Sequence, residues 1–206
     1  MLYEKDYVNK KEPLVAKTKG GKEVLAGKFK NLKDYYNAGY TIDEPWIFDF
    51  LVPDYKILEV DRFRTNKMTA AGVQMRFKYV YLVGDEISIV GLGSGKNQDK
   101  RTARLKAIEN AKKNAIIIKH GCGSRKCDPK CNRPHSISRT AIGSCASTRV
   151  KIIPAPYGKG QIAAGANLKL YQLAGIKDIW TRATKSGHRV NAIKAHFNAL
   201  RSLNQC

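Results

Sequence analysis

The sequence lacks any long apolar run. Its most apolar stretches, near residues 79–83 and 115–118, are far shorter than the roughly 20 residues that a membrane-spanning helix needs. The first twelve residues mix acidic and basic side chains and have no apolar core of the kind found in a secretory signal. We therefore expect a cytoplasmic protein that binds no membrane, in a compartment where cysteines stay reduced.

Acidic residues are almost missing from the end of the chain. The last 71 residues contain one acid, Asp178, and residues 96–206 carry 23 Lys and Arg against 4 Asp and Glu. Residues 1–95 are nearly balanced, with 15 basic against 13 acidic side chains, and the whole chain has a net charge of +21. Solubility does not require so uneven a charge, so the sequence predicts a polyanionic partner such as nucleic acid.

The residue patterns expected of an active site are also lacking. The segment 91–96 superficially resembles a phosphate-binding loop. However, Val90 stands where that loop begins with Gly, and Asn97 stands where it needs Ser or Thr. The second half contains neither a pair of carboxylates nor a Ser/His/Asp set. We predict that the protein is not an enzyme, although the alternative of an enzyme built on its last domain can be tested by searching for turnover of phosphorylated small molecules.

Residues 1–54 are predicted to form an N-terminal extension with short helices. The segment 1–30 is rich in Lys, interrupted by Pro and Gly, and poor in large apolar groups. We expect it to be an extended arm that becomes ordered on a partner. Further on, Asp43-Glu44-Pro45 indicates the start of a helix, because Pro is favoured in the first helical turn.

Residues 55–120 carry the signals of a sheet followed by a helix. Alternating apolar and polar residues predict three strands within 56–93, with a loop at 65–72. The segment 98–118 is predicted to be one helix, in which alanines at every fourth position pack on the sheet. Three strands followed by a basic helix are typical of a double-stranded-RNA-binding module, which recognises phosphates, 2′-hydroxyls and groove shape.

Residues 121–144 are predicted to be a Cys-rich connector. Cys122, Cys127, Cys131 and His135 are separated by four, three and three residues, and zinc prefers four nitrogen or sulfur ligands in a tetrahedron. The competing interpretation is a loop of reduced cysteines that RNA alone orders. Four basic residues within this segment are candidate phosphate contacts: Arg125, Lys126, Lys130 and Arg133.

Residues 145–206 are predicted to be a small α/β domain. The pattern indicates, in order, a strand at 147–154, a helix at 163–174, a strand at 176–181 and a helix at 189–203. The whole chain is therefore assigned to the α+β class, as an N-terminal extension, a double-stranded-RNA-binding-like domain and a small βαβα domain. We expect Asp178, His188 and His196 to have surface or packing roles.

Several motifs in collinear order resemble one known family. They are Gly91-Leu92-Gly93 with Lys96, Arg133-Pro134-His135-Ser136-Ile137, Ile152-Ile153-Pro154-Ala155-Pro156, the segment Leu173–Arg182 and, near the start, Val15–Lys19 and Ile42–Pro45. Together they resemble the universal small-subunit ribosomal protein five, in its archaeal–eukaryotic branch. The resemblance implies a structural protein of the small ribosomal subunit, and a second domain that shares its fold with ribosomal translocase and small-molecule kinase domains but lacks their active sites.

The resemblance also implies partners and contacts. These are small-subunit rRNA near the decoding region, mRNA at the channel through which it enters, and ribosomal proteins three, four and eight, with an effect on translational accuracy. The segment Thr65–Gly72 matches an extended hairpin that reaches rRNA in this family. Outside the connector, the expected RNA contacts are Arg64, Lys67, Arg76, Lys96, Lys100, Arg101, Arg104, Lys151 and Arg182. Tyr157 replaces an Arg common in the family and could stack on a base or ribose.

A second hypothesis shares most of these features. The protein could be an RNA-binding regulator with a zinc knuckle that acts outside the ribosome. Crosslinks mainly to mRNA would favour this alternative, whereas crosslinks mainly to rRNA would favour the ribosomal role.

Overall fold

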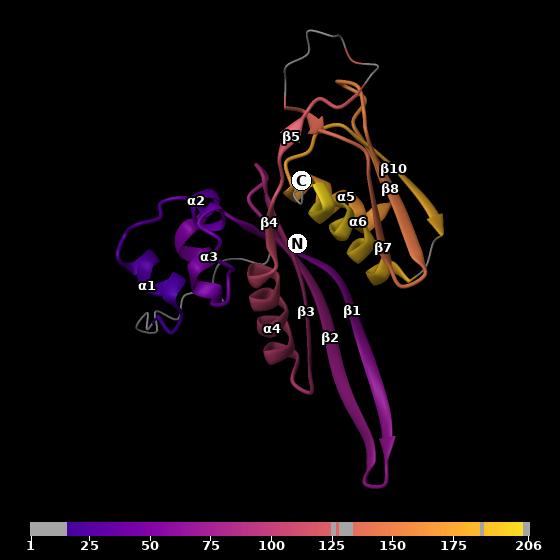
Figure 1. The fold of residues 1–206 in the computed structure, drawn as a ribbon. Coiled ribbons are helices and arrows are strands. Elements are labelled where there is room, and N and C mark those ends of the chain that lie inside the picture. Colours follow the sequence, from indigo (N-terminus) through magenta and orange to yellow (C-terminus); the bar gives the residue numbers. More distant parts are fainter. Residues whose placement is uncertain (1–15, 125–126, 128–133, 186–187, 204–206) are drawn as a thin grey trace. The chain divides into compact units, whose positions relative to one another are not determined.

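A computed structural model describes residues 16–124, 127, 134–185 and 188–203. The chain forms two compact units (Figure 1). The first contains the described residues up to Val83 together with Gly91–Ala115, and the second contains Gly84–Val90 and the described residues from Ile116 onward. None of the described helices is long and apolar enough to cross a membrane.

Three short helices precede the first sheet: α1 (Lys19–Leu25), α2 (Leu32–Asn37) and α3 (Pro45–Leu51). The prediction of an extended arm over residues 1–30 is wrong for its described part, because α1 is a capped helix and Val24 is fully buried. The glycines at 20 and 21 do not interrupt this helix, and they let aromatic rings approach it. A Cβ on Gly20 would lie within 3.0 Å of the Tyr35 ring. Residues 1–15 lie outside the described residues.

The predicted start of α3 is confirmed, with Glu44 at the N-cap and Pro45 in the first turn. The Glu44 carboxylate accepts hydrogen bonds from the backbone N–H groups of Lys17 (3.0 Å) and Thr18 (2.8 Å), and from the Trp46 indole (2.5 Å). Burial raises the pKa of this carboxyl, but these hydrogen bonds lower it more, and the net shift is downward. Glu44 thus ties α3 to the segment that leads into α1.

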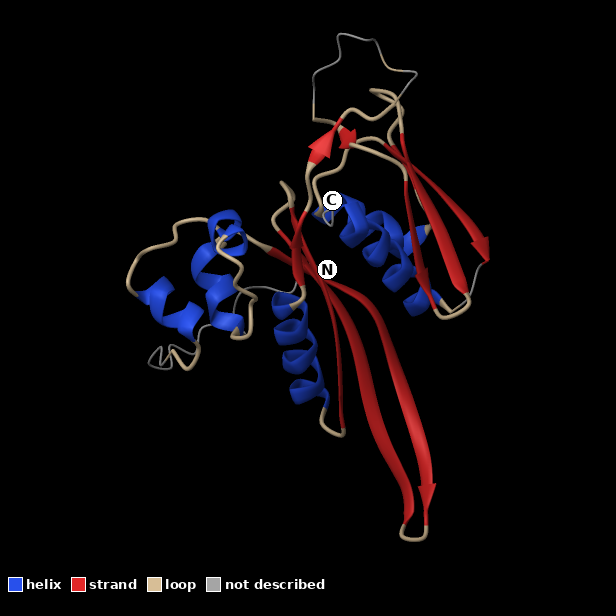
Figure 2. Ribbon diagram, in the orientation of Figure 1, coloured by secondary structure: helices blue, strands red, loops and turns tan. Residues whose placement is uncertain are grey.

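The first sheet has four strands in the order β1-β2-β3-β4 (Figure 2). They are β1 (Lys56–Thr69), β2 (Gly72–Gly84), β3 (Ile89–Asn97) and β4 (Ala115–Ile117), with helix α4 (Lys100–Lys113) between the last two. The predicted order of three strands and a helix is confirmed, but two boundaries were wrong. The loop expected at 65–72 is mostly strand, and the helix expected at 98–118 ends at Lys113, because β-branched residues follow and form β4.

Alternate glycines of β3 bring α4 unusually close to the sheet. A Cβ on Gly93 would lie 2.1 Å from the Ala111 nitrogen and 2.2 Å from the Ala107 oxygen. Gly91 and Gly95 meet the same helix in the same way. The predicted alanine stripe therefore does pack on the sheet, and the glycines of the apparent phosphate loop serve as the matching surface.

The second unit contains a two-stranded ribbon, β5 (His120–Gly121) with β6 (Ser136–Ile137), and a four-stranded sheet in the order β7-β8-β10-β9. This sheet consists of β7 (Ala141–Cys145), β8 (Thr148–Pro154), β9 (Gln161–Ile162) and β10 (Ile179–Lys185). Helix α5 (Gly165–Leu173) precedes β10, and α6 (Arg189–Leu203) packs on β7 and β8. The predicted β–α–β–α order is present, with β5, β6, β7 and β9 added to it.

Candidate RNA-binding surfaces and cysteine–histidine cluster

A basic groove with aromatic walls lies in the first unit, where residues of β1, β2 and α4 meet. It encloses about 330 Å³ and is lined by Arg62, Phe63, Arg64, Phe77, Tyr79, Lys100 and Arg104. The Lys100 Nζ lies 5.0 Å from the centre of the Phe77 ring, and the Arg104 guanidinium carbon lies 5.1 Å from that of Tyr79. These cation–π contacts keep the charged ends of Lys100 and Arg104 at the groove.

Secondary structure explains how the groove forms. Residues two apart on a strand share one face, as Arg62 and Arg64 do on β1, and residues four apart share one face of a helix. Asp99 is the N-cap of helix α4, and its carboxylate accepts a hydrogen bond from the Thr102 N–H (2.9 Å). This backbone hydrogen bond is the main cause of the lowered pKa of Asp99. The cap fixes where the helix starts, and thereby where its basic side chains lie.

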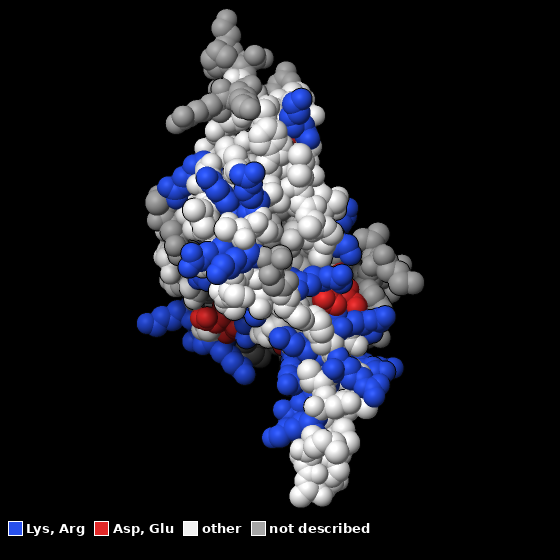
Figure 3. Space-filling model, turned by 90° about the vertical axis from the view of Figure 1, so that its right-hand side faces the viewer, with Lys and Arg blue, Asp and Glu red and all other residues white. Residues whose placement is uncertain are grey.

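The groove contains some of the predicted RNA contacts but not all of them. Arg64, Lys100 and Arg104 line it, whereas the lining does not include Lys67, Arg76, Lys96 and Arg101, which are exposed. Arg62, Phe63, Phe77 and Tyr79 were not predicted. The period of two along β1 could have placed Arg62 beside Arg64, but that period puts Phe77 and Tyr79 on the face of β2 opposite to Arg76, so their place in the groove could not be found from the predicted contacts. Figure 3 shows a face on which basic side chains far outnumber acidic ones, with an uncharged tip on the long hairpin of β1 and β2.

A second basic surface lies on the sheet of the second unit. In the antiparallel register of β8 and β10, Lys151 stands directly opposite Arg182, and Arg149 stands opposite Lys185. All four residues are exposed. Like charges in directly opposed positions destabilise an isolated sheet, so this arrangement suits an external anion that neutralises them. Lys151 and Arg182 were predicted from the sequence, whereas Arg149 and Lys185 were not.

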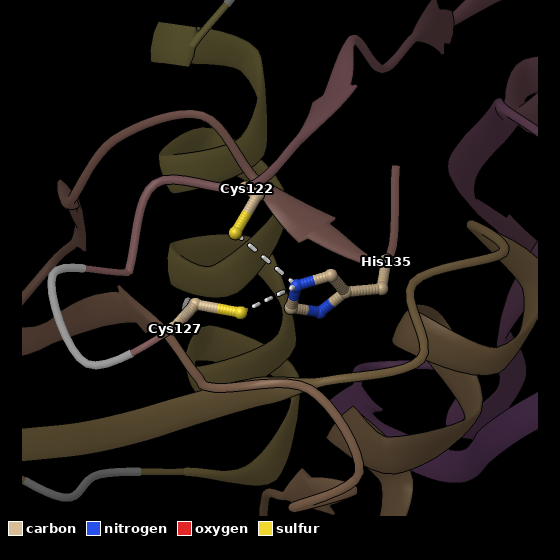
Figure 4. Close-up of side chains that lie close together, drawn as sticks. All are labelled: Cys122, Cys127 and His135. Atoms are coloured by element: carbon tan, nitrogen blue, oxygen red, sulfur yellow. Dashed lines mark hydrogen bonds between the residues drawn. The ribbon is translucent and has the colours of Figure 1, made fainter. Parts of the chain in front are cut away.

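Cys122, Cys127 and His135 lie together in the second unit (Figure 4). The His135 Nε2 atom is 3.3 Å from the Cys122 Sγ and 3.9 Å from the Cys127 Sγ. Pairing of β5 with β6 places Gly121 opposite Ser136, which brings the next residues, Cys122 and His135, side by side. Three of the four predicted zinc ligands are thus brought together. The fourth, Cys131, and the predicted contacts Arg125, Lys126, Lys130 and Arg133 lie outside the described residues.

Asp178 holds the other side of the His135 ring. Its Oδ2 lies 2.9 Å from the His135 Nδ1, and its Oδ1 accepts a hydrogen bond from the Gly160 N–H (2.7 Å). Both Asp178 and His135 are almost fully buried. The sequence predicted a surface or packing role for Asp178 and did not predict its contact with His135. One signal was available, because Asp178 is the only acid in the last 71 residues. The exposed Tyr157 places its ring edge-on to His135, with centres 5.5 Å apart.

The fold and its surfaces define a class of protein: a two-unit α+β chain with basic surfaces of the kind that suit a polyanion. Family models confirm a particular membership. The model described as "Ribosomal protein S5, N-terminal domain" matches residues 54–119, and the one described as "Ribosomal protein S5, C-terminal domain" matches residues 143–206. The chain belongs to the ribosomal protein S5 family. This is a family of structural ribosomal proteins and not of enzymes, as the sequence predicted.

Individual relatives match over nearly the whole chain. The small ribosomal subunit protein uS5 of Staphylothermus marinus is 40% identical over 192 residues, which cover 93% of this chain and 89% of that protein. The uS5 proteins of Nanoarchaeum equitans and Methanocaldococcus jannaschii are 39% and 38% identical, and each match covers 91% of this chain and 86% of the relative. These archaeal relatives confirm the predicted branch and do not favour the alternative of a regulator outside the ribosome.

Proposed function

We propose that this protein is a structural component of the small ribosomal subunit and binds its rRNA through two basic surfaces. The basic groove of Arg62, Arg64, Lys100 and Arg104 is the observation that carries the proposal, because it combines cationic side chains with aromatic walls on a sheet-and-helix unit. Phosphate contacts would supply most of the affinity through release of counterions. The row of Lys151, Arg182, Arg149 and Lys185 would bind a second stretch of backbone.

The long hairpin supports a finer proposal about location. Strands β1 and β2 have 14 and 13 residues, whereas β3 has 9. Near the hairpin tip, Met68 is 78% exposed and Val73 is 55% exposed, which is costly unless a partner covers them. We propose that this hairpin reaches rRNA near the decoding region, as the family resemblance implies.

The resemblance supports three further proposals. The protein would contact mRNA at the channel through which it enters, lie beside ribosomal proteins three, four and eight, and support translational accuracy.

Sedimentation tests the central proposal. A tagged full-length chain, expressed in a related archaeal host, should co-sediment with small subunits at physiological salt and crosslink mainly to small-subunit rRNA. A chain that sediments away from small subunits, or that crosslinks mainly to mRNA, would show that the proposal is wrong.

Paired variants test the groove itself. Arg62→Ala combined with Lys100→Ala should weaken binding of a structured rRNA fragment. The salt dependence of binding should also become shallower, by about one unit of slope for each phosphate that the variant no longer neutralises. Lys30→Ala combined with Lys33→Ala, two exposed residues at and just before α2, is the matched control because it also removes two positive charges, and both lie outside the two basic surfaces. Equal decreases in affinity for the two proteins would exclude the groove as a specific binding surface.

A further inference from the structure

We propose that Cys122, Cys127 and His135 bind a zinc ion and that Asp178 is the positioning residue of this site. The donor atoms, two Sγ and one Nε2, all lie within 4.8 Å of one another. In tetrahedral zinc sites, bond lengths of about 2.0–2.3 Å place a nitrogen and a sulfur ligand roughly 3.6 Å apart. The two His135–Cys distances, 3.3 and 3.9 Å, lie on either side of that value.

The direction of the His135 ring supports a metal between the sulfur atoms. Asp178 Oδ2, 2.9 Å from Nδ1, favours the tautomer with its proton on Nδ1 and a lone pair on Nε2. That single lone pair can accept one S–H hydrogen bond, yet two sulfur atoms converge on it. One cation bound by both thiolates and the imidazole accounts for both approaches, and this donor set suits zinc.

Hydrogen bonds fix the position of Asp178 beside the His135 ring. Its second oxygen accepts the Gly160 N–H, so the carboxylate cannot turn away without breaking a partly buried hydrogen bond. Backbone hydrogen bonds also join the two residues' segments. The His135 carbonyl accepts hydrogen bonds from the N–H groups of Lys177 and Asp178, each at 3.0 Å. Carboxylates that orient a metal-bound histidine in this way typically matter for affinity by about 10- to 100-fold.

Two features of the ribbon hold the cysteines. The Cys127 N–H donates to the Ser124 carbonyl at 3.3 Å, which holds Cys127 close to the end of β5. Gly123 donates its N–H to the Ile137 carbonyl, and a Cβ on Gly123 would lie 2.1 Å from the Ser138 oxygen. A side chain at position 123 would therefore collide with the backbone at the end of β6, and only glycine fits there.

A metal here would join parts of the second unit that are distant in the sequence. Through His135 and Asp178 it would connect the β5–β6 ribbon to the loop before β9 and the loop after α5. The site would add to the stability of this unit, and it does not depend on the proposed ribosomal function. The predicted ligand Cys131 is not part of the proposal, because it lies outside the described residues.

Metal binding to the full-length, reduced chain tests the proposal. Wild-type protein should bind one zinc ion, and cobalt(II) in its place should show the visible bands of a tetrahedral site and thiolate charge-transfer bands. Cys127→Ser should abolish tight binding, whereas Cys145→Ser, which removes a thiol on β7 outside the cluster, should not. Absence of a bound ion, or equal loss of zinc affinity in the two variants, would overturn the proposal.

Two further measurements extend the test, and the first of them needs no variant. In wild-type protein, zinc should slow alkylation of Cys122 and Cys127 but not that of Cys145, and equal rates with and without zinc would overturn the site. Asp178→Asn should weaken zinc affinity by about 10- to 100-fold while the tetrahedral cobalt spectrum persists, because the ligands remain. Unchanged affinity would exclude Asp178 as the positioning residue.

Discussion

Tyr171 and His196 form a buried pair in the second unit, with the Tyr171 hydroxyl 2.5 Å from the His196 Nδ1. Burial lowers the pKa of His196 from 6.5 to about 4, because the charged imidazolium is poorly solvated there. Burial also raises the pKa of the Tyr171 hydroxyl. The sequence placed His196 among residues with surface or packing roles, and the structure shows that it is buried and packed against Tyr171.

The second unit should lose stability in mild acid. Between pH 6.5 and about 4 the unfolded chain binds a proton that the folded chain excludes, so the free energy of unfolding falls as the pH falls through this window, by about 3 kcal/mol in all. Urea unfolding at several pH values, followed by Trp180 fluorescence in a Trp46→Phe background, measures the slope. Tyr171→Phe combined with His196→Leu should flatten it, and His188→Asn, at an exposed histidine, should not. An unchanged slope in the double variant would contradict this account.

Glu44 should also make the stability of the N-terminal helices fall in acid, independently of His196. Its lowered folded pKa means that its stabilising effect is complete above the unfolded value of 4.5 and is lost as the pH falls through the lower folded value. Glu44→Gln removes the charge that accepts the Lys17, Thr18 and Trp46 hydrogen bonds. We expect lower stability at neutral pH and a weaker acid dependence, measured by Trp46 fluorescence with Trp180→Phe. Asp43→Asn, at the exposed neighbouring acid, is the control and should resemble wild type.

At the scale of elements, the closest packing in the first unit is between β3 and α4. The glycines at 91, 93 and 95 meet the alanines of the helix, and Lys112, almost fully buried on α4, pairs with Asp49 of α3 at 2.6 Å. The helix is therefore held by the sheet on one side and by the N-terminal helices on another. The basic groove depends on this packing, because α4 supplies two of its cations.

Gly93→Ala should disturb that packing. The added methyl would overlap backbone atoms of Ala107 and Ala111, which cannot rotate away as a flexible side chain can. Overpacking of this kind typically costs about 1–3 kcal/mol, and we expect at least the upper part of this range. Ser94→Ala, the next position on the same strand, adds no atoms and should cost much less. Chemical denaturation of both variants gives the comparison, and similar stabilities would mean that the helix is not held so closely.

At the scale of the whole molecule, charge is the dominant property. The net charge of +21 lies mainly in residues 96–206, but its surfaces occur in both units, as the groove of the first and the β8–β10 row of the second. Binding through two such surfaces should depend on shape and phosphate positions rather than on base sequence.

The full-length chain should therefore bind unrelated structured RNAs with similar affinity, and that affinity should fall steeply with salt. Titrations of two unrelated RNA duplexes at several potassium chloride concentrations measure both properties. A shallow salt dependence, or a large preference for one duplex, would contradict a binding mode dominated by phosphate contacts. An uncharged polymer of similar size serves as the control for non-ionic association.

Local pattern was enough for much of the fold. Strand and helix order followed from apolar periodicity, and the start of α3 followed from Pro45, because these signals act between residues that are close in the chain. The errors lie where distant contacts overrule local preference. Residues 19–25 form a helix because aromatic rings pack on their glycines, and the strands of the hairpin continue because they pair with each other.

The sequence by itself determined the charge, the α+β class, the family and the types of the candidate metal ligands, since each is a property of composition or of short motifs. Only the tertiary structure decided which distant side chains meet. It placed Asp178 against His135, set Lys151 opposite Arg182, and gathered Arg62 with Lys100 in one groove. The physical reason is that these contacts depend on strand register and on the packing of helices against sheets, which arise from the whole core and not from neighbouring residues.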